Sequence, residues 1–156
     1  MPTLPAFDPL SLPESNATGY PQPYAEDQKK RFNRRLGNHV GLSNFGVNLT
    51  RILPGGQSSA LHGHSRQDEF VWVLEGETVL ETEAGEQLLR PGQCAGFPAG
   101  SGGAHRFLNR GDRDVLLLVV GDRTAGDEVH YPGIDMAGRQ LPDGKFLFTR
   151  KDGSAF

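Results

Sequence analysis

Short segments of alternating apolar and polar residues, separated by glycine- and proline-rich turns, constrain the fold of this chain more than any other feature. The sequence has 156 residues with 21 glycines and 11 prolines, and turn signals recur about every 8–12 residues. This spacing is typical of an all-β protein. It predicts a double-sheet jelly roll or a small barrel, in one domain that is large enough to bury a core.

Nine segments are predicted to be strands, because each alternates between apolar and polar residues or is continuously apolar. They are Val47–Leu53, Ser58–His64, Glu69–Leu74, Thr78–Glu83, Glu86–Leu89, Cys94–Phe97, Ala104–Asn109, Val115–Val120 and Phe146–Thr149. The third of them has an unusual outer face. Because strand side chains alternate between faces, Phe70, Trp72 and Leu74 lie together opposite Glu69. We expect a second sheet, the N-terminal arm or another subunit to cover them.

The N-terminal segment 1–23 is rich in proline and should run extended, without a hydrogen-bonded ladder of its own. It is either a partly disordered tail or an arm with Leu4, Phe7, Leu10 and Leu12 as anchors. Such an arm would lie along its own barrel or along a neighbour's. Together with the apolar outer face, it predicts a homodimer in which the arm takes part.

Residues 24–36 are basic and polar, and a short helix is possible because Tyr24, Phe32 and Leu36 recur at multiples of four. The segment carries five cations, namely Lys29, Lys30, Arg31, Arg34 and Arg35. We interpret these cations as a solvated face rather than as an anion site.

Two histidines and a glutamate follow one another at a spacing that suits metal binding. His62 and His64 are two residues apart on a predicted strand, so both imidazoles project from one face, with Gly63 on the other. The turn 65–68 leads into the strand that Glu69 opens. If that strand folds back beside the first, two imidazoles and a carboxylate share one concave face. This set suits a divalent transition metal with open coordination positions.

The surrounding glycines complete a recognisable spacing. Gly56, five residues, His62, one residue, His64, four residues, Glu69, six residues and Gly76 follow in that order. This stretch resembles the first conserved motif of the cupin superfamily at every fixed position.

A second stretch resembles the second cupin motif. Gly92, five residues, Pro98, one residue and Gly100 match it, and His105, three residues and Asn109 follow. The departure is that four residues stand between Gly100 and His105 where the family usually has two. Because the insert is rich in glycine and serine, we interpret it as a looser turn rather than as a lost ligand.

The resemblance implies a metal held by His62, His64, Glu69 and His105. Such a set is compatible with Zn, Fe, Mn, Ni or Co, and the sequence does not choose between these metals. The metal could act as a Lewis acid on a carbonyl or enediol, lower the pKa of a bound water, or, as iron, bind dioxygen.

The resemblance covers roughly residues 41–121 and implies a cupin-type double-stranded β-helix, a jelly-roll barrel with N- and C-terminal extensions. We therefore expect an extended arm with a possible short helix at 1–36, the barrel domain at 37–121, and a C-terminal extension at 122–156 packed on the barrel.

Several chemically capable residues lie outside the two motifs. Tyr131 is a candidate general acid or base because its loop could reach the mouth of the barrel. Cys94 is expected to be a buried, inert thiol in the core or the pocket wall. Asp68 should face solvent, by alternation with Glu69.

The remaining histidines and two phenylalanines receive structural roles. His39 and His130 belong to no motif, so surface or turn positions are expected for them. Phe97 and Phe107 are expected to be walls of the pocket or the core.

Charge and composition exclude several classes of partner. The net charge of −3 offers no basic excess to neutralise nucleic-acid phosphates. The longest apolar run, Val115–Val120, is far shorter than the roughly 20 residues that span a bilayer. Residues 1–12 lack the basic start and unbroken apolar stretch of a signal peptide. The single cysteine fits a reducing compartment, so a cytoplasmic location is predicted.

The family's known activities include sugar or sugar-phosphate isomerases, dioxygenases, decarboxylases and lyases, and also non-catalytic ligand-binding domains. Our leading hypothesis is a metal-dependent enzyme of the isomerase, lyase or dioxygenase kind, acting on a small molecule in the barrel. The alternative is a non-enzymatic binding or sensor module whose metal is structural. Convergent polar groups around the open metal face would favour the enzyme, and an apolar or closed mouth would favour the module.

Overall fold

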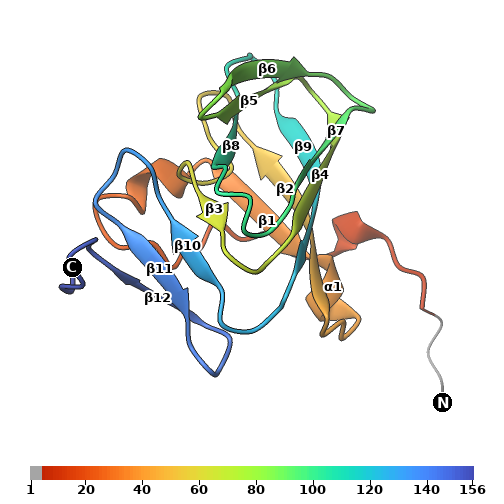
Figure 1. The fold of residues 1–156 in the computed structure, drawn as a ribbon. Helices are drawn as coiled ribbons and strands as arrows, with labels where there is room; N and C mark the ends of the chain where they lie inside the picture. The colour runs from red at the N-terminus through yellow and green to blue at the C-terminus, as the bar shows by residue number, and fades with distance from the viewer. Residues whose placement is uncertain (1–4) are drawn as a thin grey trace.

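The computed structural model describes residues 5–156, which form three antiparallel sheets (Figure 1). The largest has the order β1 (Arg31–Arg35), β2 (Phe45–Ile52), β9 (Val115–Asp122), β4 (Glu69–Glu75) and β7 (Cys94–Phe97). The second has the order β6 (Gly85–Leu89), β5 (Thr78–Thr82) and β8 (His105–Leu108). The third has the order β12 (Phe146–Thr149), β11 (Ala137–Gln140), β10 (Glu128–His130) and β3 (Gly63–His64). Short helical turns occur at Pro9–Ser11, Glu26–Gln28 and α1 (Leu36–His39).

The first two sheets face each other across an apolar core, which confirms the predicted jelly-roll fold. The buried cluster consists of Ile52, Val71, Val73, Leu80, Leu89, Phe107, Val115 and Leu117. Burying each of these large side chains contributes about 1.5–3 kcal/mol relative to leaving it in water. Phe97 packs against the cluster and Phe107 belongs to it, so both are walls of the core as predicted.

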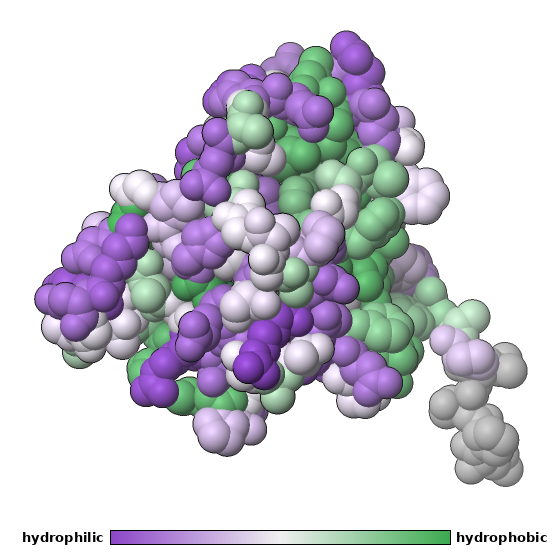
Figure 2. Space-filling view, in the orientation of Figure 1, coloured by the Kyte–Doolittle hydropathy of each residue, from purple (hydrophilic) through white to green (hydrophobic). Residues whose placement is uncertain are grey.

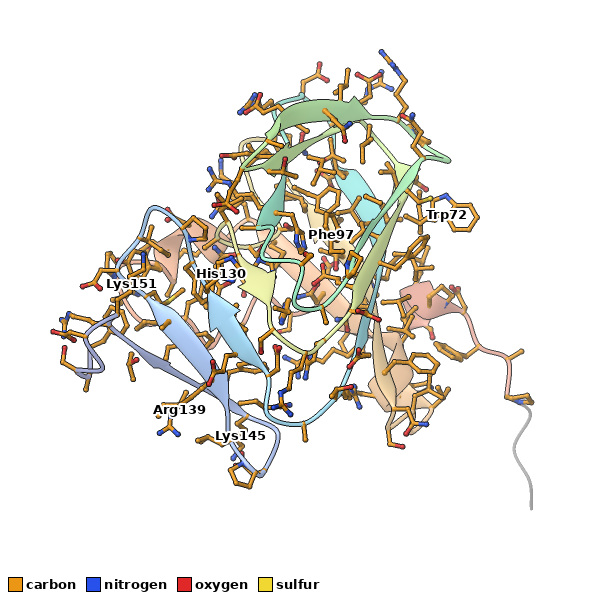
Figure 3. The ribbon with its side chains drawn as sticks, in the orientation of Figure 1. Trp72, Phe97, His130, Arg139, Lys145 and Lys151 are labelled. Carbon is orange, nitrogen blue, oxygen red and sulfur yellow. The ribbon has the colours of Figure 1, made fainter. Side chains whose placement is uncertain are left out.

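Strand β4 shows why alternation predicts the orientation of these strands well. Val71 and Val73 are 1% and 0% exposed, whereas Phe70, Trp72 and Leu74 are 41%, 46% and 38% exposed. Neither the second sheet nor the described part of the arm buries this outer face within the chain. Figure 3 shows Trp72 directed away from the barrel.

The C-terminal residues build the third sheet against the edge of the barrel. Val129 of β10 pairs with His64 of β3, so the extension continues directly from the strand that carries the histidines (Figure 1). A second apolar cluster of Ala60, Val129, Tyr131 and Met136 fastens this sheet to the barrel.

The short helix that is possible within residues 24–36 is present only as a three-residue 3₁₀ turn. The chain makes one 3₁₀ turn at Glu26–Gln28 and then forms β1, which pairs with β2 over its whole length, from Arg31↔Ile52 to Arg35↔Asn48. The tertiary ladder overrides a weak helical period, because β2 would otherwise present an unpaired edge.

The strand expected at Ser58–His64 is shorter than predicted. Gln57 and His62 form isolated bridges to β8, residues 58–61 bend, and only Gly63–His64 is a regular strand. The segment therefore pairs with β8 through Gln57 and His62, and with β10 through Gly63–His64.

The N-terminal arm lies along β1 of its own chain. Ser15 bridges Asn33, and Glu14 forms ion pairs with Arg34 and Arg51. Of the predicted apolar anchors, Phe7 and Leu10 are 36% and 61% exposed, Leu12 is half-buried, and Leu4 lies outside the described residues.

Four further single-residue predictions can be compared with the fold. Cys94 is exposed, so its predicted burial is wrong: it pairs with Trp72, and directly opposed residues share a face of the sheet, here the outer one. Asp68 is exposed as predicted, and so are His39 and His130.

Within residues 5–156, no helix is long and apolar enough to cross a membrane.

Candidate metal centre

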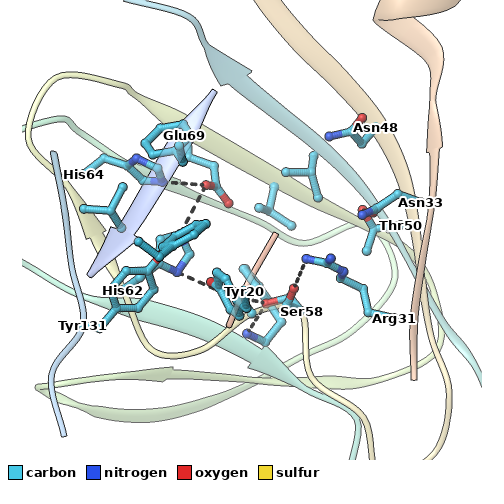
Figure 4. A pocket seen from close by; sticks show the side chains of 17 residues that line it. Tyr20, Arg31, Asn33, Asn48, Thr50, Ser58, His62, His64, Glu69 and Tyr131 are labelled. Carbon is cyan, nitrogen blue, oxygen red and sulfur yellow. Dashed lines mark hydrogen bonds and ion pairs between the residues drawn. The ribbon is translucent and has the colours of Figure 1, made fainter. Parts of the chain in front are cut away.

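Four side chains converge at one end of the barrel. Figure 4 shows three of them, His62, His64 and Glu69. His62 precedes β3, His64 ends it, Glu69 begins β4 and His105 begins β8. The Nε2 atoms of His62 and His64 lie 3.9 and 3.8 Å from Glu69 Oε2, and the Nε2 of His105 lies 3.3 Å from Glu69 Oε1. Ligand atoms of His62, Glu69 and His105 all lie within 4.8 Å of one another.

Hydrogen bonds to the other ring nitrogens orient the two histidines of the His-Gly-His stretch. The Nδ1 of His62 lies 3.0 Å from the carbonyl of Ala60 and 3.1 Å from the hydroxyl of Ser59. The Nδ1 of His64 lies 2.6 Å from the carboxylate of Asp127. An acceptor at Nδ1 keeps the proton on that nitrogen, which leaves Nε2 with a free lone pair facing Glu69.

His105 is held by packing and by the backbone. Its ring stacks on Phe97 with centroids 3.5 Å apart and planes 7° apart, and its backbone exchanges hydrogen bonds with that of His62. The insert before it is a turn with Gly100 and Gly102 at positive φ, and it does not remove His105 from the cluster. Among the described residues, nothing bonds the buried Nδ1 of His105.

Burial and proximity set the charge of the cluster. Burial lowers the pKa of His62 to about 4, so this imidazole is neutral near pH 7. For Glu69, burial opposes ionisation, but the hydrogen bond with His105 and the neighbouring imidazoles outweigh it and lower the pKa. Neutral imidazole nitrogens beside a carboxylate are the donors that a divalent transition metal takes. The residues present therefore fit the metal that the pattern predicts.

Asp127 is a candidate site residue that sequence reasoning missed. Its side chain is fully buried and accepts hydrogen bonds from the backbone of Arg66 and the hydroxyl of Ser65, in addition to its contact with His64. It stands 63 residues after His64 in the sequence, and no motif marks it. Only the pairing of β10 with β3 brings it to the site.

Tyr131 lies in the cavity wall, a position that a general acid or base acting on a bound ligand would need. It is 3% exposed and its ring centroid is 6.1 Å from that of His62. Burial raises the pKa of the Tyr131 phenol far above its usual value, and the neighbouring Tyr20 raises it further. The phenol therefore stays protonated, so it can donate a hydrogen bond or a proton but does not rest as a base.

The cluster opens into a cavity of about 230 Å³ whose far wall is polar (Figure 4). Polar residues of this wall are Arg31, Asn33, Asn48, Thr50 and Ser58. Arg31 is half-buried there, so its assignment to a solvated face is wrong. The polar alternation of residues 31, 33, 48 and 50 would have signalled this wall if residues 31–35 had been predicted as a strand.

Comparison with known proteins gives the family. A model described as a cupin domain matches residues 48–121. A structure described as a sugar phosphate isomerase from a cupin superfamily, from Silicibacter pomeroyi, is 45% identical over 97% of this chain and 96% of that chain, with a TM-score of 0.92. The chain belongs to the cupin superfamily.

Two other solved structures are similar to this chain at lower sequence identity. A structure described as a putative sugar phosphate isomerase from Acidithiobacillus ferrooxidans is 32% identical, covers 81% of this chain and 80% of that chain, and has a TM-score of 0.72. A polyketide cyclase from Streptomyces resistomycificus, 20% identical over 77% of this chain and 80% of that chain with a TM-score of 0.63, shares the fold. No curated protein matches the sequence.

Residues outside the matched cupin segment complete the site. Tyr20 and Arg31 come from the N-terminal side of residues 48–121, and Asp127 and Tyr131 come from the C-terminal side. Both flanks of this cupin therefore build walls of the cavity.

Proposed function

We propose that this cupin binds one divalent transition metal through His62, His64, Glu69 and His105 and isomerises a small hydroxy-carbonyl compound of the sugar or sugar-phosphate class. The observation that carries the proposal is the open cavity lined by His62, His64 and Glu69, whose far wall is polar. An apolar or closed mouth would have favoured a structural metal instead. The two proteins described as sugar phosphate isomerases support the choice of substrate class.

A bound metal would supply Lewis acidity toward a carbonyl or enediol oxygen. The protein residues supply position and proton control. Tyr131, which stays protonated, can donate a hydrogen bond to a ligand oxygen in the cavity. The Thr50 hydroxyl donates to the side-chain oxygen of Asn33 at 2.7 Å, which fixes this amide in the polar wall.

Metal analysis of the untagged protein tests the first half of the proposal. About one equivalent of a first-row metal is expected, and the double variant His62→Ala/His64→Ala should lose most of it. Asp68→Asn is the matched control, because Asp68 is exposed beside Glu69 and should keep the metal. Full metal content in the double variant would reject the ligand set.

Isomerisation is tested by following the exchange of carbon-bound hydrogen in deuterated water. Metal-loaded protein should incorporate deuterium next to the carbonyl of a sugar phosphate, and the chelator-treated protein should not. Oxygen consumption without such exchange would favour a dioxygenase. Ligand binding with neither reaction would favour the non-enzymatic binding module.

We also propose that the protein is a homodimer, formed through the outer face of β4. Phe70, Trp72 and Leu74 are exposed on one face, and Figure 2 shows apolar side chains along the edge of the molecule where Trp72 lies in Figure 3. Phe7 and Leu10 of the arm are also exposed and are free to contact a second copy.

Light scattering should give twice the chain mass of 17.0 kDa. Trp72→Lys should shift the protein toward the monomer, whereas Leu88→Lys, at a residue of β6 that is 48% exposed, should not. Deleting residues 2–20 tests the arm. A full-length protein that is monomeric at micromolar concentration would refute the dimer.

A further inference from the structure

Arg31 is a half-buried cation without an acidic partner. Its Nη1 donates to the carbonyl of Ser58 at 3.1 Å, while its Nε is buried and has no hydrogen-bond partner. The nearby Arg34 and Arg51 both pair with Glu14. Within the described part of the chain, no ion pair involves Arg31, so the protein leaves this charge unmatched.

An unmatched guanidinium is costly to bury. Arginine cannot be deprotonated in proteins, and burying a charge destabilises the folded state unless the charge is paired. Burial accordingly lowers the pKa of Arg31, which nonetheless remains charged. A residue kept under this penalty, in the wall of a ligand cavity, indicates that a bound anion supplies the missing partner.

The position of Arg31 fits that role. β1 carries it into the cavity that also contains His62 and Glu69, and Figure 4 shows its guanidinium on the opposite side of the cavity from His64 and Glu69. Its neighbours on that wall include the amides of Asn33 and Asn48, and no carboxylate lies among the residues of that wall. A ligand in the cavity therefore meets the metal-binding cluster at one end and a cation at the other.

We propose that Arg31 binds a terminal oxyanion, a phosphate or a carboxylate, on the sugar-like ligand whose other end faces the metal-binding cluster. The planar guanidinium offers parallel N–H donors that match either oxyanion in two-pronged geometry. This proposal rests on the proposed function for the location of the ligand, and it adds the residue that selects anionic ligands over neutral ones.

Three six-carbon probes separate the possible ligands: glucose 6-phosphate, gluconate and glucose. Binding to the metal-loaded protein is measured by calorimetry. We expect the protein to prefer one or both anionic probes to glucose. Arg31→Gln should weaken anion binding about 10- to 100-fold, the range for a hydrogen bond to a charged group, and should leave glucose binding and metal content unchanged. The stronger anionic probe identifies the phosphate or the carboxylate.

Two further variants serve as controls. Arg31→Lys keeps the positive charge but loses the planar pair of N–H donors, so it should retain part of the preference for anionic probes. It also provides a test if Arg31→Gln does not fold. Lys29→Gln removes an exposed cation two residues away and should bind like wild type. Equal anion affinity in wild type and Arg31→Gln would overturn the proposal, and so would a wild-type protein that prefers no anion.

The same titrations on chelator-treated protein, with inorganic phosphate as an additional probe, separate this proposal from the proposed function. Phosphate or probe binding that depends on Arg31 without metal would support the anion site even if the metal assignment fails. Metal binding together with anion binding that does not depend on Arg31 would overturn the anion site alone.

Discussion

Replacing Asp127 with asparagine tests whether a buried carboxylate prepares His64 for metal binding. Asp127 is 0% exposed, and its oxygens lie 2.6 Å from His64 Nδ1 and 2.8 Å from the backbone nitrogen of Arg66. In Asp127→Asn, the amide oxygen can still accept from Arg66. The amide NH₂ would then face His64 Nδ1, which would have to become an acceptor. The imidazole proton would move to Nε2, the atom that faces Glu69.

The change should therefore lower metal affinity without preventing folding. Loss of an outer partner of a metal-ligating histidine lowers metal affinity about 10- to 100-fold, which corresponds to about 1.4–2.7 kcal/mol. Loss of one hydrogen bond to a charged group should lower the free energy of unfolding of the metal-free protein by about 1.5–3 kcal/mol. A folded variant with weakened metal binding is thus expected.

Competition with a chromophoric chelator measures the affinity for Zn²⁺ or Co²⁺, and urea unfolding of the metal-free protein measures stability. The matched control is Asp122→Asn, because Asp122 accepts hydrogen bonds from the backbones of Asp68 and Thr124 and makes none to a histidine. The control should keep the wild-type affinity. Wild-type affinity in Asp127→Asn, or an equal loss in both variants, would refute the tautomer argument.

Three other predictions concern stability. Free metal at about 100 times its dissociation constant should raise the free energy of unfolding by roughly 2.7 kcal/mol, which corresponds to about 5–11 °C in melting temperature. The metal should add stability to a protein that folds without it, so a metal-free protein that is unfolded by circular dichroism at 25 °C would contradict the prediction. Burial lowers the pKa of His62 from 6.5 to about 4, so as the pH falls this imidazole takes up a proton in the unfolded chain before it does so in the folded protein. Urea titrations of the metal-free protein should therefore show the free energy of unfolding falling as the pH drops from 6.5 to 4. A flat profile would contradict the burial argument. Gly76 has φ +75 and a Cβ there would lie 2.5 Å from the carbonyl of Asp114, whereas Gly41, at the same φ, has open space. By thermal unfolding, Gly41→Ala should cost about 1 kcal/mol and Gly76→Ala clearly more, and equal costs would show that the contact relaxes.

Local sequence patterns predicted the orientation of strand side chains correctly where one face of the strand is buried and the other is not. Alternation placed Val71 and Val73 inside and Trp72 outside, and the turn glycines marked most strand ends to within two residues. It failed for Cys94, because the outer face on which Cys94 lies is itself apolar, so alternation alone did not say which face was the core.

By itself, the sequence determined the barrel and the convergence of the motif side chains. The period of strand side chains places His62 and His64 on one face, and the fixed turn returns Glu69 to them, so short-range geometry is enough. The tertiary structure alone decided what surrounds them. Asp127 reaches His64 through the pairing of β10 with β3, and Arg31 enters the cavity because β1 pairs with β2 instead of forming a helix. Both contacts depend on pairing between strands that are separated in the sequence, and short-range patterns do not specify which strand edges pair.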